Sequence, residues 1–249
     1  MQKKPKSPYP KFLKRLLKKV LPNNYYINLI GRHEKTSIAI WKLLSKKIKP
    51  DESIIDIGAY YGEYSKFSRL NNLESKIYAF EPNSFIIDIL KSNCENLDIN
   101  IEEIALSDID GKAKFFIDGK VSSLKSNKSN QDFLEVGIRT IDSYVEEHID
   151  SPPKLIKIDT EGNEPLIIKG GLNTIKKYNP IILCEVLNDE IGMNISKVLP
   201  DNYFYYHIDE KYRLLEKKKK IDRKLWRNRN WLFIPSFEKK IIEKFSSLD

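Results

Sequence analysis

The sequence predicts an α/β fold in which helices cover both faces of a mostly parallel sheet. Strand-like apolar runs alternate with amphipathic helical segments along residues 34–236, as in parallel strands joined by helical crossovers. With 41% apolar residues in a chain of 249, one large core can form. Several of the runs end in acidic residues or glycines. Because ligands of parallel sheets bind beyond the strand ends, these residues indicate a binding site.

Helices are expected where apolar residues recur three and four positions apart. The segment KTSIAIWKLLSKKI, residues 35–48, has this spacing and forms the first expected helix. The later ones are expected at residues 62–70, 84–96, 141–148, 164–169 and about 189–198.

Strands are expected where short apolar, often β-branched runs lie between turn-forming residues. They are expected at residues 53–58, 75–81, 99–106, 154–159, 180–186, 203–208 and 230–236. The stretch SDIDGKAKFFID, residues 107–118, is typical of a hairpin with its turn at Asp110 and Gly111.

The net charge of +8 is concentrated in two segments. Residues 1–20 and residues 211–229 each carry a net charge of +8, so the remaining residues together carry −8. A groove that follows a nucleic acid backbone needs positive charge on the body of the protein, unless basic arms supply it. The charge distribution therefore makes nucleic acid an unfavoured partner.

Residues 1–33 form a basic amphipathic arm before a domain expected at residues 34–249. In KFLKRLLKKVL, residues 11–21, apolar residues fall on one helical face and lysine and arginine on the other. Such a helix packs on the domain, the arrangement we favour, or makes peripheral contact with an anionic membrane. Both arrangements stay open.

The expected compartment is the cytoplasm, with the arm able to reach the inner face of the membrane. Cys94 and Cys184 lie in apolar contexts and are expected to be buried thiols. No apolar run approaches the roughly 18 residues of a membrane span, and the N-terminus lacks the apolar core of a signal peptide.

The stretch SIIDIGAYYGEYSKF, residues 53–67, joins a strand to a helix through Gly58 and Gly62. Glycines permit a tight turn and close approach of a ligand, and the helix presents free N–H groups. The spacing is not that of a dinucleotide site, and there is no P-loop lysine. Asp56 suits a cationic amino group, and Glu81 is placed to accept hydrogen bonds from both ribose hydroxyls. S-adenosylmethionine has both features.

Five blocks occur in the order and spacing typical of the FkbM family of S-adenosylmethionine-dependent methyltransferases: IDIGAYYGEYS, YAFEPNS, EIALSD, LIKIDTEGNEPLIIKG and NWLFIP. The sequence resembles this family over roughly residues 34–235. The resemblance implies a Rossmann-like class I methyltransferase fold with a seven-stranded, mostly parallel sheet and an antiparallel last strand. It also implies methyl transfer to a hydroxyl oxygen, often of a sugar or polyketide, so the acceptor is expected to be a sugar, a polysaccharide or another glycan, or another hydroxylated small molecule.

The resemblance further implies cofactor contacts at the glycine turn and at the ends of the next strands, with adenine near residues 104–107. The expected cofactor-binding residues are Asp56, Gly58, Ala59, Tyr60, Gly62, Tyr64, Glu81, Pro82, Ile104, Ala105, Leu106, Ser107 and Asp159. The sequence departs from the family at the bulky Tyr60 and Tyr61, at Asn163 and in the arm, which leaves the acceptor open.

Acidic residues end four of the expected strands: Asp56, Glu81, Asp159 and Glu185. Methyl transfer depends mainly on holding an acceptor oxygen about 3 Å from the methyl carbon, and a nearby carboxylate or imidazole can take its proton. We expect Asp159 to organise cofactor and acceptor and Glu161 to act as the base or as a ligand of the acceptor, although the roles of the two residues can be exchanged.

His207, at the end of a strand, is a third catalytic candidate. We expect Glu164 to stabilise the dipole of its own helix. A metal-assisted mechanism would place Mg²⁺ on Asp159, Glu185 and Asn188, but we favour catalysis without a metal.

The polar stretch DGKVSSLKSNKSNQDF, residues 118–133, has the length of a lid over the acceptor, with Ser122 and Ser123 on sugar hydroxyls. Two alternative functions stay open. One is a nucleic acid methyltransferase that uses the arm and residues 211–229, and the other is a binding protein without activity. The sequence does not determine the oligomeric state.

Overall fold

The computed structural model describes residues 34–117, 123–124, 132–222 and 229–238. The predicted arm, Ser122 and most of the predicted lid lie outside these residues. In the part of the chain that is described, no helix has the length and hydropathy needed to cross a bilayer.

Eight strands form the main sheet. They are β1 (Ser53–Ile57), β2 (Lys76–Phe80), β3 (Asn100–Glu102), β7 (Pro153–Ile158), β8 (Ile181–Glu185), β9 (Tyr203–Asp209), β10 (Leu214–Lys218) and β11 (Asn230–Pro235). Their order is β10-β9-β11-β8-β7-β1-β2-β3. The strands from β3 to β8 are parallel, whereas β11 runs antiparallel to its neighbours β8 and β9. The predicted α/β class, the mostly parallel sheet and its antiparallel last strand are confirmed.

The prediction of seven strands was one short, because β10 adds an eighth at the edge of the sheet. The sequence of β10, LLEKK, carries only two apolar residues. An edge strand needs only one hydrogen-bonded neighbour and keeps one face in water, so no long apolar run marks it.

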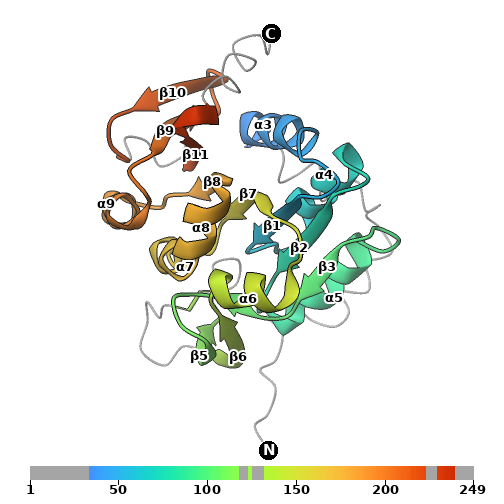
Figure 1. Ribbon diagram of the computed structural model, residues 1–249. Helices are drawn as coiled ribbons and strands as arrows, with labels where there is room; N and C mark the ends of the chain where they lie inside the picture. The colour runs from blue at the N-terminus through green and yellow to red at the C-terminus, as the bar shows by residue number, and fades with distance from the viewer. Residues whose placement is uncertain (1–33, 118–122, 125–131, 223–228, 239–249) are drawn as a thin grey trace, which may run out of the picture.

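Seven helices of the described chain cover the two faces of the sheet (Figure 1). One face carries α3 (Lys35–Ser45), α4 (Glu63–Asn71) and α5 (Ser84–Asn93). The other carries α6 (Ile141–His148), α7 (Glu164–Gly170), α8 (Leu172–Tyr178) and α9 (Asp189–Val198). The sequence analysis missed α8, whose seven residues follow α7 after the single residue Gly171. A 3-10 turn, Ser236–Glu238, follows β11.

The strands contribute alternate residues to two separate cores. Ile54 and Leu155 pack toward the fully buried Trp41 of α3. Their neighbours Ile55 and Ile156 pack on the opposite face, against α6, α7 and α9. Because side chains alternate along a strand, this register decides on which face each polar residue at a strand end lies.

A second, three-stranded sheet has the order β4-β6-β5, with β4 (Ala105–Leu106), β5 (Gly111–Phe116) and β6 (Phe133–Arg139). The prediction of one strand over residues 99–106 was therefore wrong, because the chain leaves β3 and enters this sheet at β4. The predicted hairpin turn at Asp110 and Gly111 was also wrong. β5 begins at Gly111 and pairs antiparallel with β6. The sequence analysis did not predict β6, since the stretch interpreted as a polar loop ended at Phe133 and residues 134–139 were assigned to no element.

Candidate active site

Four carboxylates gather on one face and one edge of the main sheet. Asp56, Glu81, Asp159 and Glu185 lie at or just past the ends of β1, β2, β7 and β8, which are neighbours. Residues two or four positions earlier, such as Ile54 and Leu183, pack toward α3 and α4. The carboxylates therefore face the same side, as the alternation along a strand requires.

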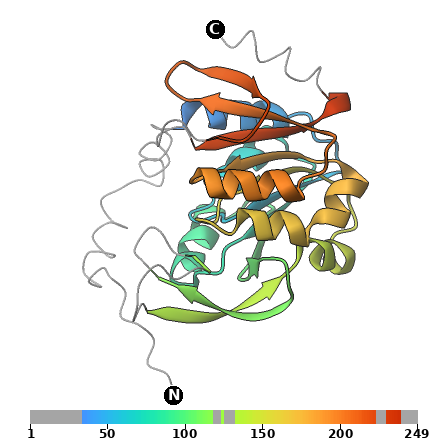
Figure 2. The ribbon, with the colours of Figure 1, turned by 90° about the vertical axis from the view of Figure 1, so that its left-hand side faces the viewer.

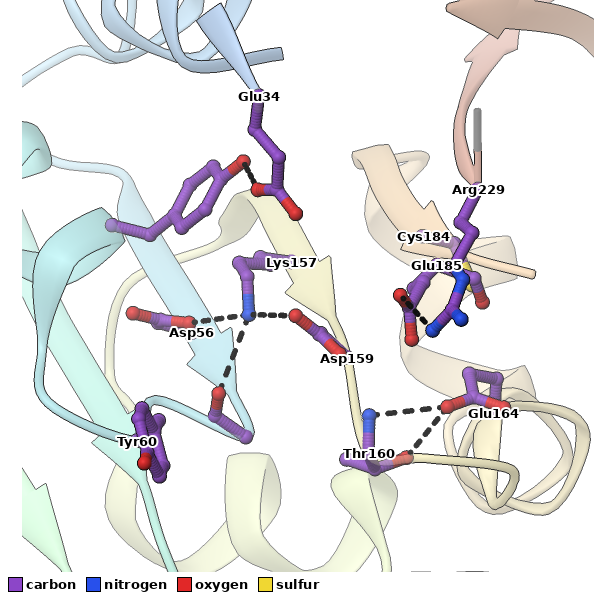
Figure 3. Close-up of polar contacts among 12 residues, drawn as sticks. Glu34, Asp56, Tyr60, Lys157, Asp159, Thr160, Glu164, Cys184, Glu185 and Arg229 are labelled. Carbon is purple, nitrogen blue, oxygen red and sulfur yellow. Dashed lines mark hydrogen bonds and ion pairs between the residues drawn. The ribbon is translucent and has the colours of Figure 1, made fainter. Parts of the chain in front are cut away.

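Lys157 lies in the middle of this group (Figure 3). Its side chain is buried, and its Nζ lies 3.6 Å from Asp56 Oδ1, 3.4 Å from Asp159 Oδ2 and 3.3 Å from the carbonyl oxygen of Gly58. Burial opposes the charge, but Asp159, Asp56 and Glu34 outweigh it and raise the pKa of the Lys157 ammonium. Lys157 is therefore a permanent cation that joins the ends of β1 and β7.

The sequence analysis did not select Lys157, although a signal was present. In LIKID the lysine interrupts a strand expected to be buried on both faces, and it stands two residues before Asp159. A spacing of two places both side chains on one face, and a buried lysine requires a carboxylate partner.

Asp56 is fully buried beneath the glycine turn. Its Oδ2 accepts a hydrogen bond of 2.6 Å from Ser65 Oγ, and its Oδ1 faces Lys157. Sequence reasoning assigned this acid to the cofactor directly. In the structure its contacts are with the protein, which makes it the anchor of Lys157.

Glu34 is a further site residue that the sequence analysis missed. It precedes α3 and accepts a hydrogen bond of 2.9 Å from the hydroxyl of the buried Tyr64. Burial and the nearby charge of Asp159 raise the pKa of Glu34. Burial and the charge of Glu34 likewise raise the pKa of Glu63 to about 7. The edge therefore carries more acid than Lys157 alone neutralises.

Gly58 is required by the close approach of β1 and β7. Its φ is +74°, and a Cβ at this position would lie 1.8 Å from the carbonyl oxygen of Asp159. At Gly62, where φ is +82°, a Cβ would lie 2.5 Å from Leu90 of α5. The first glycine thus shapes the turn beside Asp159, and the second also allows α4 to pack on α5. Between them, the predicted contact Ala59 is buried against α5.

Glu81 closes the glycine turn from the β2 side. Its two carboxylate oxygens accept hydrogen bonds from the backbone N–H groups of Tyr60 (3.0 Å) and Asn83 (2.8 Å). Each oxygen keeps a second lone pair, as binding of a ribose diol would require. Burial raises the pKa of Glu81 to about 7. The ring of Tyr60 packs against Tyr61, with centroids 3.8 Å apart.

The predicted adenine segment, residues 104–107, lies beside the turn that follows β7. Buried Asn163 donates a hydrogen bond of 3.0 Å from Nδ2 to the carbonyl of Leu106. At Gly170 a Cβ would lie 2.1 Å from the carbonyl oxygen of Ser107. These two contacts hold the segment against α7 and give Asn163 a structural role that a small residue could not fill.

Pro82, another predicted cofactor residue, borders a shallow pocket of about 150 Å³. Its other lining residues come from the start of α5, the β3–β4 connection and β6. The pocket adjoins Glu81 and therefore extends the edge away from Asp159.

Glu161 lies in the turn between β7 and α7, with its backbone in the left-handed region at φ +56°. Its carbonyl accepts a hydrogen bond of 3.1 Å from Ser123 Oγ, so the described tip of the predicted lid contacts this turn. Burial and the charge of Asp159 raise the pKa of Glu161 to about 6. Glu164 Oε1 accepts hydrogen bonds from the backbone N–H and the hydroxyl of Thr160 (Figure 3) and from Gly162 N, so this side chain holds the turn that precedes α7.

Glu185 forms the outer end of the group. Arg229 Nη1 lies 3.4 Å from its Oε1, whereas burial, Asp159 and Glu161 raise the pKa of Glu185 to about 9. Arg229 also opposes the rise of the Glu161 pKa and is a second cation that the sequence analysis did not select.

Two predicted candidates lie apart from this group. His207 lies on β9, three strands from β7 and thus roughly 14 Å away at usual strand spacing, and its ring centre is 5.0 Å from that of Trp231. Asn188 is exposed and caps α9, accepting a hydrogen bond from Ile191 N. Among the described residues, no three His, Cys, Asp or Glu side chains are grouped to hold a metal ion.

The donor set fits S-adenosylmethionine. Gly58 has no side chain that would keep a ligand away from the turn. The Glu81 carboxylate offers lone pairs to the two hydroxyls of a ribose. Buried oxygens without a hydrogen-bond donor include Glu63 Oε1 and Glu185 Oε2. Uncompensated carboxylates favour a cationic ligand at this edge.

Comparisons with known proteins point to one family. The profile of the methyltransferase FkbM domain matches residues 56–200. Hexuronic acid methyltransferase AglP of Haloferax volcanii is 26% identical over 148 residues, which cover 57% of this chain and 59% of that protein. The alignment thus spans less than two thirds of that relative.

Two solved structures illustrate the structural likeness. Methyltransferase FkbM from Methylobacillus flagellatus KT has a TM-score of 0.48 and 17% identity, covering 74% of this chain and 44% of its own. The O-methyltransferase from Bacillus cereus in complex with SAH has a TM-score of 0.49 and 13% identity, covering 90% and 97%. The profile match spans more than half of the sequence and includes the glycine turn, Glu81, Asp159 and Glu161. This chain belongs to the FkbM methyltransferase family.

Proposed function

We propose that this protein transfers a methyl group from S-adenosylmethionine to a hydroxyl group of a saccharide. One observation carries the proposal. Asp159, with a side chain that is 35% exposed, lies at the edge of the sheet and is paired with a buried lysine. An accessible carboxylate on a fixed support can orient an acceptor hydroxyl.

The cofactor supplies a methyl carbon already activated by its sulfonium. The glycine turn and Glu81 would hold its amino acid and ribose parts, with the segment at Ile104–Ser107 beside the adenine. Asn163 and Gly170 support this assignment, since they hold that segment close to α7. Lys157 keeps Asp56 and Asp159 in place, so little reorganisation is needed when ligands bind.

Glu161 is the proposed base. A carboxyl whose pKa is about 6 is mostly ionised at neutral pH and is more basic than an exposed glutamate. Ser123 holds the backbone of Glu161 from across the site. Asp159, whose Oδ2 lies 3.4 Å from Lys157 Nζ, is the proposed organiser of the acceptor.

The acceptor class follows from two features. The edge is lined by carboxylates and by hydrogen-bonding groups, which suit a polyhydroxylated ligand. The relative from Haloferax volcanii is a hexuronic acid methyltransferase, so saccharides that contain hexuronic acid come first among the acceptors to test.

The test uses the purified full chain, S-adenosylmethionine with a tritiated methyl group, and saccharide fractions with and without hexuronic acid. We expect labelled saccharide whose methyl group survives mild alkali, as a methyl ether does. Label released by alkali would identify a methyl ester on a carboxylate and would contradict transfer to a hydroxyl. Asp159→Asn and Glu161→Gln should abolish or strongly reduce labelling, whereas Glu95→Gln, at an exposed position outside the site, should not.

A further inference from the structure

The turn after β9 and strand β10 form a strongly basic surface. This basic hairpin, residues 211–220, contains six lysine or arginine residues and one acid, Glu216. Lys218 pairs with Glu216 and Lys220 lies 3.9 Å from Asp222. Within the described part of the chain, no carboxylate lies at ion-pair distance from four of the six: Lys211, Arg213, Lys217 and Lys219.

The basic hairpin lies at the edge of the sheet that carries the candidate active site. β9 is antiparallel to β11, which is antiparallel to β8, so β9 and β8 end at the same edge. Glu210, at the start of the turn, accepts hydrogen bonds from Thr36 N and Ser37 N in the first turn of α3. The adjacent Glu34 faces Lys157 and Asp159. Figure 2 shows the turn on the left-hand side, where α9 also begins.

Negative and positive charge therefore lie on two different parts of this edge of the sheet. The edge around Asp159 has a surplus of carboxylates, whereas the neighbouring turn is basic and exposed. An acidic ligand cannot place its anionic groups among the carboxylates, but it can place them on the hairpin and a neutral hydroxyl at Asp159.

We propose that the basic hairpin binds the anionic groups of an acidic saccharide whose hydroxyl is the methyl acceptor. This inference rests on the proposed function and narrows its substrate class. Lysines in β10 itself also shield an open sheet edge from pairing with other strands. The assignment therefore depends on Lys211 and Arg213, which lie in the turn, outside the strand.

The experiment measures binding of a fluorescent oligogalacturonate to the full chain, with a neutral dextran oligomer of equal length as the uncharged probe. The test variant is Lys211→Gln with Arg213→Asn, since asparagine tolerates the left-handed backbone of position 213, where φ is +54°. The control variant, Lys46→Gln with Lys91→Gln, removes the same charge at exposed sites outside the hairpin. We expect about tenfold weaker oligogalacturonate binding in the test variant and less than twofold in the control.

Three results would overturn the inference. Equal losses in both variants would show that only net charge matters. Undiminished binding by the test variant would remove the hairpin from the interaction. Tighter binding of the wild type to RNA or to phosphatidylglycerol vesicles than to oligogalacturonate, with the same dependence on the hairpin, would assign the surface to another partner. Calorimetry with S-adenosylhomocysteine tests the proposed function separately from the hairpin. Both variants should bind S-adenosylhomocysteine as tightly as the wild type does. Failure of the wild type to bind it would contradict the proposed function and not the inference about the hairpin.

Discussion

Lys157 and Asp56, on the neighbouring strands β7 and β1, form a buried ion pair in which the nitrogen and oxygen are 3.6 Å apart. Both side chains are almost inaccessible to solvent, and Asp159 shares the same ammonium at 3.4 Å. One cation thus holds two carboxylates at the point where β1 and β7 reach the candidate active site.

Removal of this cation should destabilise the protein strongly. We expect Lys157→Met to lower the free energy of unfolding by roughly 3 to 5 kcal/mol, because it leaves buried carboxylates without a counter-charge. Chemical denaturation measures the change. Lys154→Met is the matched control on the same strand, where the ammonium contacts only a carbonyl, that of Tyr178, among the contacts described. Similar losses in the two variants would contradict a special role for Lys157.

Gly58 should tolerate no side chain. Gly58→Ala would place a Cβ 1.8 Å from the carbonyl oxygen of Asp159 with the backbone at φ +74°. We expect a loss of at least about 3 kcal/mol in unfolding free energy, together with loss of S-adenosylhomocysteine binding. In the control Gly137→Ala the new Cβ meets Ile104 at 3.4 Å, and the loss should stay below about 1 kcal/mol. A stable Gly58→Ala protein would show that β1 and β7 can separate at this point.

Glu210 should act as the N-terminal cap of α3, although it lies 174 positions after Thr36 in the sequence. It accepts hydrogen bonds from Thr36 N at 2.7 Å and Ser37 N at 3.0 Å. Glu210→Ala should cost about 1 to 2 kcal/mol of unfolding free energy, the usual loss for a helix cap. The exposed Glu216→Ala should change it by less than about 0.5 kcal/mol. Equal effects would mean that the cap contributes nothing.

The unliganded protein should become less stable as the pH rises from about 5 to 8. Burial raises the pKa of Glu161 to about 6, of Glu63 and Glu81 to about 7 and of Glu185 to about 9. Acids with raised folded-state pKa values bind more protons folded than unfolded in this range. The free energy of unfolding therefore falls with increasing pH.

Denaturation curves at pH 5, 6, 7 and 8 measure this slope. Each unit of raised pKa corresponds to about 1.4 kcal/mol, so Glu185→Gln should flatten the slope measurably. The exposed Glu95→Gln should leave it unchanged. Stability that rises with pH across this range would contradict the burial of these acids.

Much of the fold could be predicted because the main elements carry strong local patterns. β1, β2, β7 and β8 are mostly apolar runs between turn residues, as is typical of strands covered on both faces. β10 and β6 carry charged residues and were missed. Neither strand is covered on both faces, so no strong apolar period marks it in the sequence.

The candidate site was predicted in part for the same reason. Asp56, Glu81, Asp159 and Glu185 could be found because each stands at the end of an apolar run. Glu34 and Arg229 lie outside such runs, and their place beside Asp159 and Glu185 depends on how α3 and β11 pack. His207 ends an equally plausible run, but β8 and β11 lie between its strand and β7.

The sequence alone determined which strand ends carry acids and where glycine permits a turn, because these properties belong to residues close together in the chain. Tertiary structure alone decided that Lys157 neutralises Asp56, that Glu210 caps α3 and that Asn163 holds Leu106. Partners of this kind lie far apart in the chain, and no local pattern encodes which strands and helices become neighbours. Their contacts arise only when burial of the two cores brings those elements together.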